Sequence, residues 1–183
     1  MDTAVNDDAY VRRVAEDTVT VSRLLPASRE RVWDYLTDPQ LRRLWLADGP
    51  FDLRPGGAIE LVFRNSTLTP DDIPAPPHHA VSASEMAMKG EIILCEPPRR
   101  LAFLWHMGTE TTQVDFALET KGDKTLLTLT HSRVTSRGLM LNIAGGWHTH
   151  LDVLVARLEG RPHPGFWRQF TALEPDYAQR IPA

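Results

Sequence analysis

An apolar run near the C-terminal end of the chain constrains the fold more than any other feature of the sequence. Its members recur at steps of three and four: Met140, Ile143, Ala144, Trp147, Leu151, Leu154 and Leu158. Residues at this spacing share one face of an α-helix, so the run predicts an amphipathic helix of about five turns. Gly160 supplies a stop signal for this helix. Such a helix needs an apolar surface of similar length to pack against.

Four segments with the pattern of β-strands come before this helix in quick succession. They read "MKGEIILCE", "RRLAFLWHM", "TTQVDFALET" and "KTLLTLTHSRV", and short turns rich in Pro, Gly and Asp separate them. Short connections between consecutive strands indicate an antiparallel sheet. The third segment alternates most cleanly, with Val114, Phe116 and Leu118 on one side, so one face of the sheet is expected to be covered.

The N-terminal half adds further elements to this sheet and helix. "TVTVSRLL" alternates as a strand, and two short helices are expected near 28–36 and 39–46, the second beginning after Asp38-Pro39. "FDLRPGGAIELVFR" has the outline of a hairpin. The order predicts an α+β protein with about six strands, a curved antiparallel sheet wrapped around a long C-terminal helix, and two short helices after the first strand.

The chain divides into three expected regions. Residues 1–16 form a loose leader or a short helix, 17–160 form the domain, and 161–183 form a helical tail interrupted near Pro175. The irregular 65–88 stretch is a long loop, either a cover for a functional site or disordered. In the tail, Phe166, Trp167 and Phe170 either seal the chain's own core or form a two-fold interface, and we expect a homodimer.

Composition excludes several classes of partner. A formal net charge of −4 gives no general attraction to nucleic acid or to an anionic membrane. No apolar run approaches the roughly 20 residues of a membrane helix, and the N-terminus has no apolar signal core. We therefore expect a cytoplasmic protein. The single cysteine, Cys95, rules out an intramolecular disulfide and a zinc site built on cysteines.

Five pieces of the sequence, in the correct order, resemble a known superfamily. They are "LLPASRERVWDYLTDPQLRRLWL", "RPGG", "GEIILCEPPRRLAFLWH", "LTLTHS" and "GWHTHLDVLVARLEG". The chain resembles START-like proteins of the helix-grip (Bet v 1-like) fold, and more narrowly the family named after the C-terminal domain of the heat-shock protein 90 ATPase activator. This resemblance implies an internal ligand cavity. It does not imply one reaction, because related members include ligand carriers, polyketide cyclases and co-chaperone domains.

Aromatic side chains are the main candidates for contacting a ligand. The resemblance places Trp45, Trp105 and Trp147 near the cavity, where an indole N–H could bond one polar ligand atom. Ordinary core packing is the alternative for each, and Met88 and Met107 could extend the lining. The predicted ligand-binding residues are Trp45, Phe63, Phe103, Trp105, Phe116, His131, Ile143, Trp147, His150 and Leu151.

Catalytic and metal-binding signals are weak. His131 follows the Leu127/Leu129 face, where it could orient a ligand, act as a base with Glu91, or serve as a structural histidine. We expect no metal at His78-His79, whose acidic neighbours in sequence are several residues away. His148 and His150 lie about 200° apart on a helix and cannot share one ion. No nucleophile elbow, P-loop or Rossmann fingerprint is present, so we expect no cofactor.

Two adjacent glycines, Gly145 and Gly146, interrupt the long helix at a cost of roughly 1 kcal/mol each relative to alanine. Close packing against a strand or the small helices would explain them. A flexible joint and a role in shaping a cavity are the alternatives.

Together these observations favour a protein that binds a small hydrophobic or aromatic ligand in an internal cavity, without catalysis. The alternatives are a polyketide-cyclase-like enzyme and a co-chaperone-like protein-interaction domain.

Overall fold

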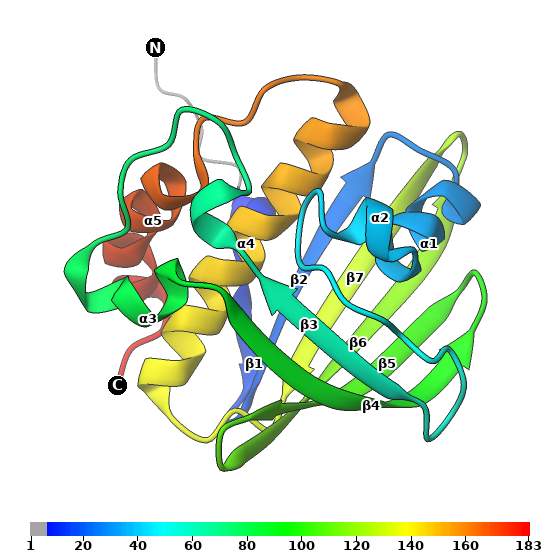
Figure 1. The fold of residues 1–183 in the computed structure, drawn as a ribbon, viewed down its shortest axis with the longest axis horizontal. Coiled ribbons are helices and arrows are strands. Elements are labelled where there is room, and N and C mark those ends of the chain that lie inside the picture. The colour runs from blue at the N-terminus through cyan, green and yellow to red at the C-terminus, as the bar shows by residue number, and fades with distance from the viewer. Residues whose placement is uncertain (1–6) are drawn as a thin grey trace.

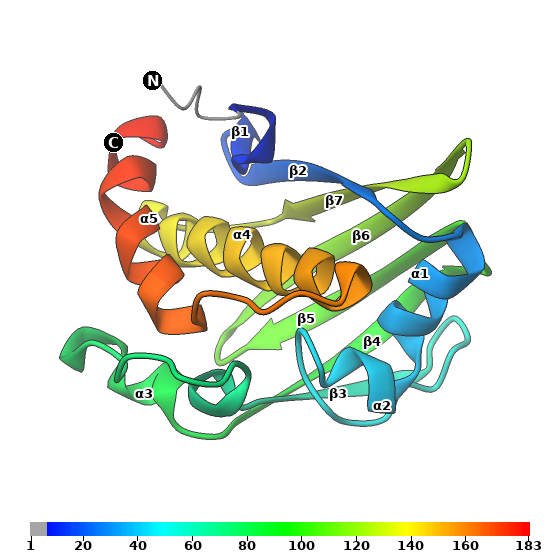
Figure 2. The same cartoon turned by 90° about the horizontal axis from the view of Figure 1, so that it is seen from above.

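A computed structural model describes residues 7–183 of the chain, so the first six residues of the expected leader lie outside the described part. One antiparallel sheet wraps around one long helix (Figures 1 and 2). The strands are β1 (Arg12–Ala15), β2 (Thr18–Leu25), β3 (Ala58–Phe63), β4 (Met86–Glu96), β5 (Arg100–Met107), β6 (Glu110–Lys121) and β7 (Lys124–Ser132). Their order in the sheet is β1-β2-β7-β6-β5-β4-β3. The α+β helix-grip prediction is confirmed.

The long helix α4 (Arg137–Glu159) is the central element that the sheet encloses. Ser136 begins it by accepting a hydrogen bond from the Leu139 backbone N–H, and Gly160 ends it in the left-handed conformation with φ 66°. The concave face of the sheet presents the buried residues of β6 and β7, whose burial alternates along each strand. The core therefore lies between this face and α4.

Six short helical segments and one longer helix complete the described fold. The 3₁₀ segments are η1 (Asp7–Ala9), η2 (Asn65–Thr67) and η3 (Pro77–His79), and the α-helices are α1 (Arg29–Thr37), α2 (Pro39–Arg42), α3 (Ala80–Ala83) and α5 (Phe166–Arg180). α1 and α2 lie near one end of α4, whereas α5 and the segment containing α3 lie near the other (Figure 2). None of the described helices is long and apolar enough to cross a membrane.

Three elements of the N-terminal half differ from those expected from the sequence. The described part of the leader contains β1, which pairs with β2 and adds a seventh strand. The second short helix ends at Arg42 rather than near residue 46. The first arm of the expected hairpin forms only isolated bridges, Asp48 to Val62 and Phe51 to Ile59.

The C-terminal helix also differs from the prediction. α5 continues through Pro175, although proline removes one backbone hydrogen bond from a helix interior. Its burial outweighs this loss, because Phe166, Trp167, Phe170 and Tyr177 are all buried within the chain.

A partly buried ionic network connects α4 to its surroundings. Asp152 on α4 lies 2.9 Å from the guanidinium of Arg23 on β2, and Gln169 on α5 donates to its other oxygen over 2.5 Å. Burial alone would raise the pKa of Asp152, but a hydrogen bond from His148 and the charge of Arg23 lower it to about 2. This carboxylate thus joins three elements that are distant in the sequence.

Candidate functional site

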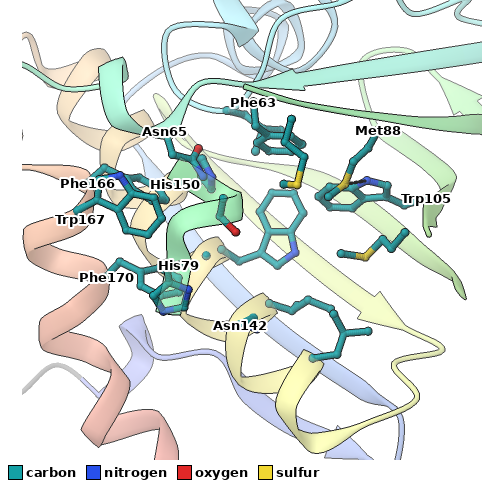
Figure 3. Close-up of a pocket in the computed structure, with 18 residues that line it drawn as sticks. Phe63, Asn65, His79, Met88, Trp105, Asn142, His150, Phe166, Trp167 and Phe170 are labelled. Atoms are coloured by element: carbon teal, nitrogen blue, oxygen red, sulfur yellow. Dashed lines mark hydrogen bonds between the residues drawn. The ribbon is translucent and has the colours of Figure 1, made fainter. Parts of the chain in front are cut away.

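A cavity of about 220 Å³ lies between α4, the β3–β4–β5 side of the sheet, and the segments that follow β3 and α4 (Figure 3). Its walls are formed by Leu46, Phe63, Asn65, His79, Ser82, Met86, Met88, Trp105, Met107, Leu139, Asn142, Ile143, Gly146, Trp147, His150, Phe166, Trp167 and Phe170. An enclosed apolar cavity of ~150 Å³ is known to hold benzene, so this cavity has room for a small aromatic molecule.

Aromatic rings contact one another along the sheet side of the cavity. The rings of Phe63 on β3 and Trp105 on β5 are stacked, with centroids 5.6 Å apart and planes 8° apart. Trp147 on α4 meets Trp105 edge to face at 5.9 Å. Alternation along β3 and β5 turns these side chains toward α4. Met88 and Met107 lie beside them, and their flexible thioethers adapt to ligands of different shape.

The indole N–H groups at this site are all used inside the protein. Trp105 donates to Sδ of Met88 (2.8 Å) and Trp167 donates to Oγ of Ser66 (3.0 Å). Trp45 and Trp147 also donate to groups of the protein, and neither leaves its N–H free. The expected use of an indole N–H to bond a ligand is therefore wrong for this structure.

His131 lies behind the cavity wall and has no free nitrogen. Its Nδ1 accepts from the Trp147 indole over 2.9 Å, so Nε2 carries the proton and donates to Oγ1 of Thr112 over 2.8 Å. Thr112 in turn lies 3.6 Å from Sδ of Met107. Burial lowers the pKa of His131 to about 3. A neutral histidine with both nitrogens bonded does not act as the proposed base.

Glu91 points away from the core. It is exposed on β4, whereas the adjacent Ile92 is fully buried. A bulge between Ile92 and Leu94 changes the alternation of the strand beyond this point. The expected pair of Glu91 with His131 does not form.

The predicted ligand-binding residues separate into two groups. Phe63, Trp105, Ile143, Trp147 and His150 lie on the cavity wall. The others are buried in the core and do not reach it: Trp45, Phe103, Phe116, His131 and Leu151. The role of the first group in ligand binding stays a prediction.

His150 presents an unshared lone pair to the cavity. Its Nδ1 lies 2.8 Å from the backbone carbonyl of Trp45, which can only accept, so Nδ1 carries the proton. Burial lowers the pKa of His150 to about 4, against the effect of that carbonyl, so the ring is neutral near pH 7. Nε2 has no hydrogen-bond partner among residues 7–183.

Asn65 was missed by the sequence reasoning because it follows β3 within an irregular stretch. Its side chain is only 7% exposed and lines the cavity. Its Oδ1 is buried without a hydrogen-bond partner in the described structure. A buried polar atom without a partner is rare in folded proteins and calls for an explanation.

The 65–88 segment and α5 together close one side of the cavity. Phe166, Trp167 and Phe170 form an apolar cluster with Leu68, Ile73, Ala75 and Ala83. The carboxylate of Asp72 accepts from the backbone N–H groups of Trp167 (2.7 Å) and Arg168 (3.1 Å). Asp72 therefore caps α5 from a position far away in the sequence. We call 65–88 the cover segment.

The aromatic residues of the tail are buried within the chain, which removes them as the basis for a two-fold interface.

A cluster of metal-ligand type joins this closure to α5, with His79 buried on the cavity wall and His78 exposed. Nε2 of His79 is 2.6 Å, and Nε2 of His78 is 3.1 Å, from Oε1 of Glu174 on α5. The ligand atoms of the three residues all lie within 4.8 Å of one another. The sequence argument against a metal here considered only acidic neighbours along the chain and could not include Glu174.

The paired glycines have different surroundings. A methyl group at Gly145 would lie 3.1 Å from a ring carbon of Phe170, so this glycine permits close packing of α5 and not of a strand or small helix. A methyl group at Gly146 would meet no atom within 4 Å, and Gly146 lines the cavity. One glycine admits a neighbouring helix and the other leaves space.

Comparison with known proteins agrees with this architecture. A sequence model of the family described as activator of Hsp90 ATPase homolog 1-like proteins matches residues 26–159. The chain belongs to this family. The match includes the whole of α4 and the sheet apart from β1 and β2, whereas α5 lies beyond it. No curated protein matches the chain.

Solved structures resemble this member of the activator-homologue family over most of its length. A Bordetella parapertussis protein encoded by gene BPP1335 is 38% identical, with a TM-score of 0.78 over 93% of this chain and 90% of its own. CalU16 from Micromonospora echinospora is 27% identical, with a TM-score of 0.68 over 91% of this chain and 89% of its own. DynU16, described as a putative protein in the dynemicin biosynthetic locus, is 22% identical with a TM-score of 0.64, and the match covers 81% of this chain and 49% of that protein.

Proposed function

We propose that the protein binds a small hydrophobic or aromatic ligand in the cavity between α4 and the sheet, and releases it unchanged. The observation that carries this proposal is the cavity itself, whose sheet side consists of Phe63, Trp105, Met88 and Met107. Ligand sites are typically concave and mostly apolar with a few placed polar groups, and this cavity has that composition.

The absence of turnover is supported by the chemistry of the lining. None of the cavity-lining residues of the described chain is an Asp, Glu, Lys, Arg, Cys or Tyr. His131, the base expected for a cyclase-like reaction, is committed to internal hydrogen bonds. His150 has a pKa of about 4, far below the range in which a general base is efficient near pH 7.

Native mass spectrometry of the freshly purified full chain tests this proposal, followed by denaturing extraction of any bound molecule. We expect one small apolar molecule per chain, or stoichiometric uptake of 2-methylnaphthalene or naphthalene by the empty protein. Binding should quench the fluorescence of tryptophan, since Trp105 and Trp147 line the cavity. An empty protein that takes up neither probe would refute the proposal. The cytoplasmic location and the homodimer expected from the sequence stay predictions.

A further inference from the structure

A few polar side chains lie among the apolar residues of the cavity wall, and some of them have unused hydrogen-bonding atoms. The indole N–H groups of the three tryptophans on the cavity wall, Trp105, Trp147 and Trp167, all donate to groups of the protein. Three buried residues on the wall have hydrogen-bonding capacity that no described residue uses: His79 keeps Nδ1 while Nε2 contacts Glu174, and the others are His150 and Asn65. His150 and Asn65 are drawn near Phe166 and Trp167, at the opposite side of the view from Trp105 and Met88 (Figure 3). The ring centroids of His150 and Phe166 are 4.8 Å apart.

The protonation of His150 determines that the ligand group bonded to it must be a hydrogen-bond donor. Because Nδ1 donates to Trp45, Nε2 is an acceptor and pairs only with a ligand group that carries a proton. A ligand carbonyl or ether oxygen would place two lone pairs against each other. A carboxylate would add the cost of burying a charge, and no cationic side chain lines the cavity to compensate.

Asn65 narrows the choice further. Neither atom of its amide has a hydrogen-bond partner among the described residues. An amide can turn over and present either its oxygen or its nitrogen. A hydroxyl can donate its one proton to Nε2 of His150 and at the same time accept from the amide N–H of Asn65, once that amide turns its nitrogen toward the ligand.

The geometry points to a neutral aromatic ligand that carries a hydroxyl group, a phenol or an aryl alcohol, with that hydroxyl at the His150–Asn65 side of the cavity. This inference rests on the proposed function and specifies the class of ligand for the same cavity. It also explains why a buried asparagine without a partner is present: leaving such a group unsatisfied is costly in the empty protein, and the ligand would supply the missing bond.

Equilibrium dialysis of the full chain against matched two-ring probes at pH 7 tests the inference. The probes are 2-naphthol, the similarly sized 2-methylnaphthalene, and 2-naphthoate. The measured quantity is the ratio of the Kd of 2-methylnaphthalene to the Kd of 2-naphthol, compared between the parent protein and its variants. This comparison cancels the different hydration of the two probes.

Two variants remove the polar groups, and one serves as a control. We expect Asn65→Leu and His150→Phe each to lower the ratio by about fivefold or more, since each loses a hydrogen bond to the hydroxyl. Asn65→Leu keeps the size of the side chain and should fold at least as stably, so it decides the question even where His150→Phe destabilises the protein. Thr171→Val removes another buried hydroxyl without a partner, outside the cavity, and should leave the ratio unchanged.

The outcomes separate the inference from the proposed function. An unchanged ratio in Asn65→Leu, or tighter binding of 2-naphthoate than of 2-naphthol, would overturn the inference while leaving the binding function intact. Failure of all three probes to bind would overturn both.

Discussion

The indole N–H of Trp147 donates to Nδ1 of His131 over 2.9 Å, linking the central helix to strand β7 beneath the cavity. The bond fixes the histidine as an acceptor at one nitrogen and a donor at the other. It also holds the Trp147 ring, which forms part of the cavity wall. A residue that the sequence suggested for ligand chemistry thus supports the wall from behind.

Replacing this histidine should therefore affect stability much more than binding. In His131→Leu the Trp147 N–H and the Thr112 hydroxyl lose their partner in a buried place, at a cost of about 2–4 kcal/mol in the free energy of unfolding. Urea denaturation measures the loss, and His106→Leu at an exposed position is the control. A variant as stable as the parent protein would show that the hydrogen-bonded chain contributes nothing.

Two buried neutral histidines should make the protein sensitive to mild acid. Burial lowers the pKa of His131 from 6.5 to about 3 and of His150 from 6.5 to about 4. Below pH 6.5 these histidines bind protons in the unfolded chain but stay neutral in the folded chain. The free energy of unfolding is therefore unaffected by them above this pH and falls as the pH drops. Each histidine lowers the free energy of unfolding by about 1.4 kcal/mol per pH unit, His150 down to about pH 4 and His131 down to about pH 3.

Urea midpoints measured from pH 7.5 to pH 4.5 check this dependence. A free energy of unfolding that stays constant from pH 6.5 to pH 5 would contradict the neutral, buried state of both rings.

The two glycines of α4 offer a matched pair of substitutions. Gly146→Leu places a side chain in open space on the cavity wall, so we expect at least about tenfold weaker ligand binding with little loss of stability. Gly145→Leu drives a side chain against Phe170 and should cost about 1–3 kcal/mol of stability. Thermal unfolding and dialysis on both variants measure the two effects. Similar behaviour of the two variants would refute the division of roles.

The cap that Asp72 provides should govern how firmly the cover segment is held. Asp72→Ala removes the acceptor for the first N–H groups of α5, at a cost of about 1–2 kcal/mol. Amide hydrogen exchange followed by mass spectrometry should show faster exchange in residues 66–83 and near the start of α5, with β6 and β7 unchanged. Faster exchange spread evenly over the whole protein would instead indicate global destabilisation.

The sequence predicted the parts of the fold that local patterns encode. The stripe of α4, the alternation along β6 and β7, and the helix start at Asp38-Pro39 are local signals, and each corresponds to an element of the structure. β1 was missed because its short segment, Arg12–Ala15, is exposed throughout and has no alternating burial. The bulge in β4 was missed because one extra residue leaves no reliable mark in a single sequence.

The candidate site was predictable only where strands and α4 form its wall. Phe63 and Trp147 follow from alternation and helical spacing, but Asn65 and Phe166 reach the cavity from irregular or distant segments. Their placement depends on contacts between residues about 95 positions or more apart, such as Asp72 with Trp167. Such contacts follow from tertiary packing and have no local pattern.

The cap formed by Asp72 also has a consequence for how the cavity is completed as the chain is made. The sheet and α4 are assembled from residues 12–159, yet the cover segment gains its anchor only when residues 166–170 have been added. Until then that side of the cavity lacks Phe166, Trp167 and Phe170, and we expect the proposed ligand to have access to it before the last helix docks. Substitutions in this late helix can therefore change which molecules are admitted and how long they remain, while the sheet and the central helix stay as they are.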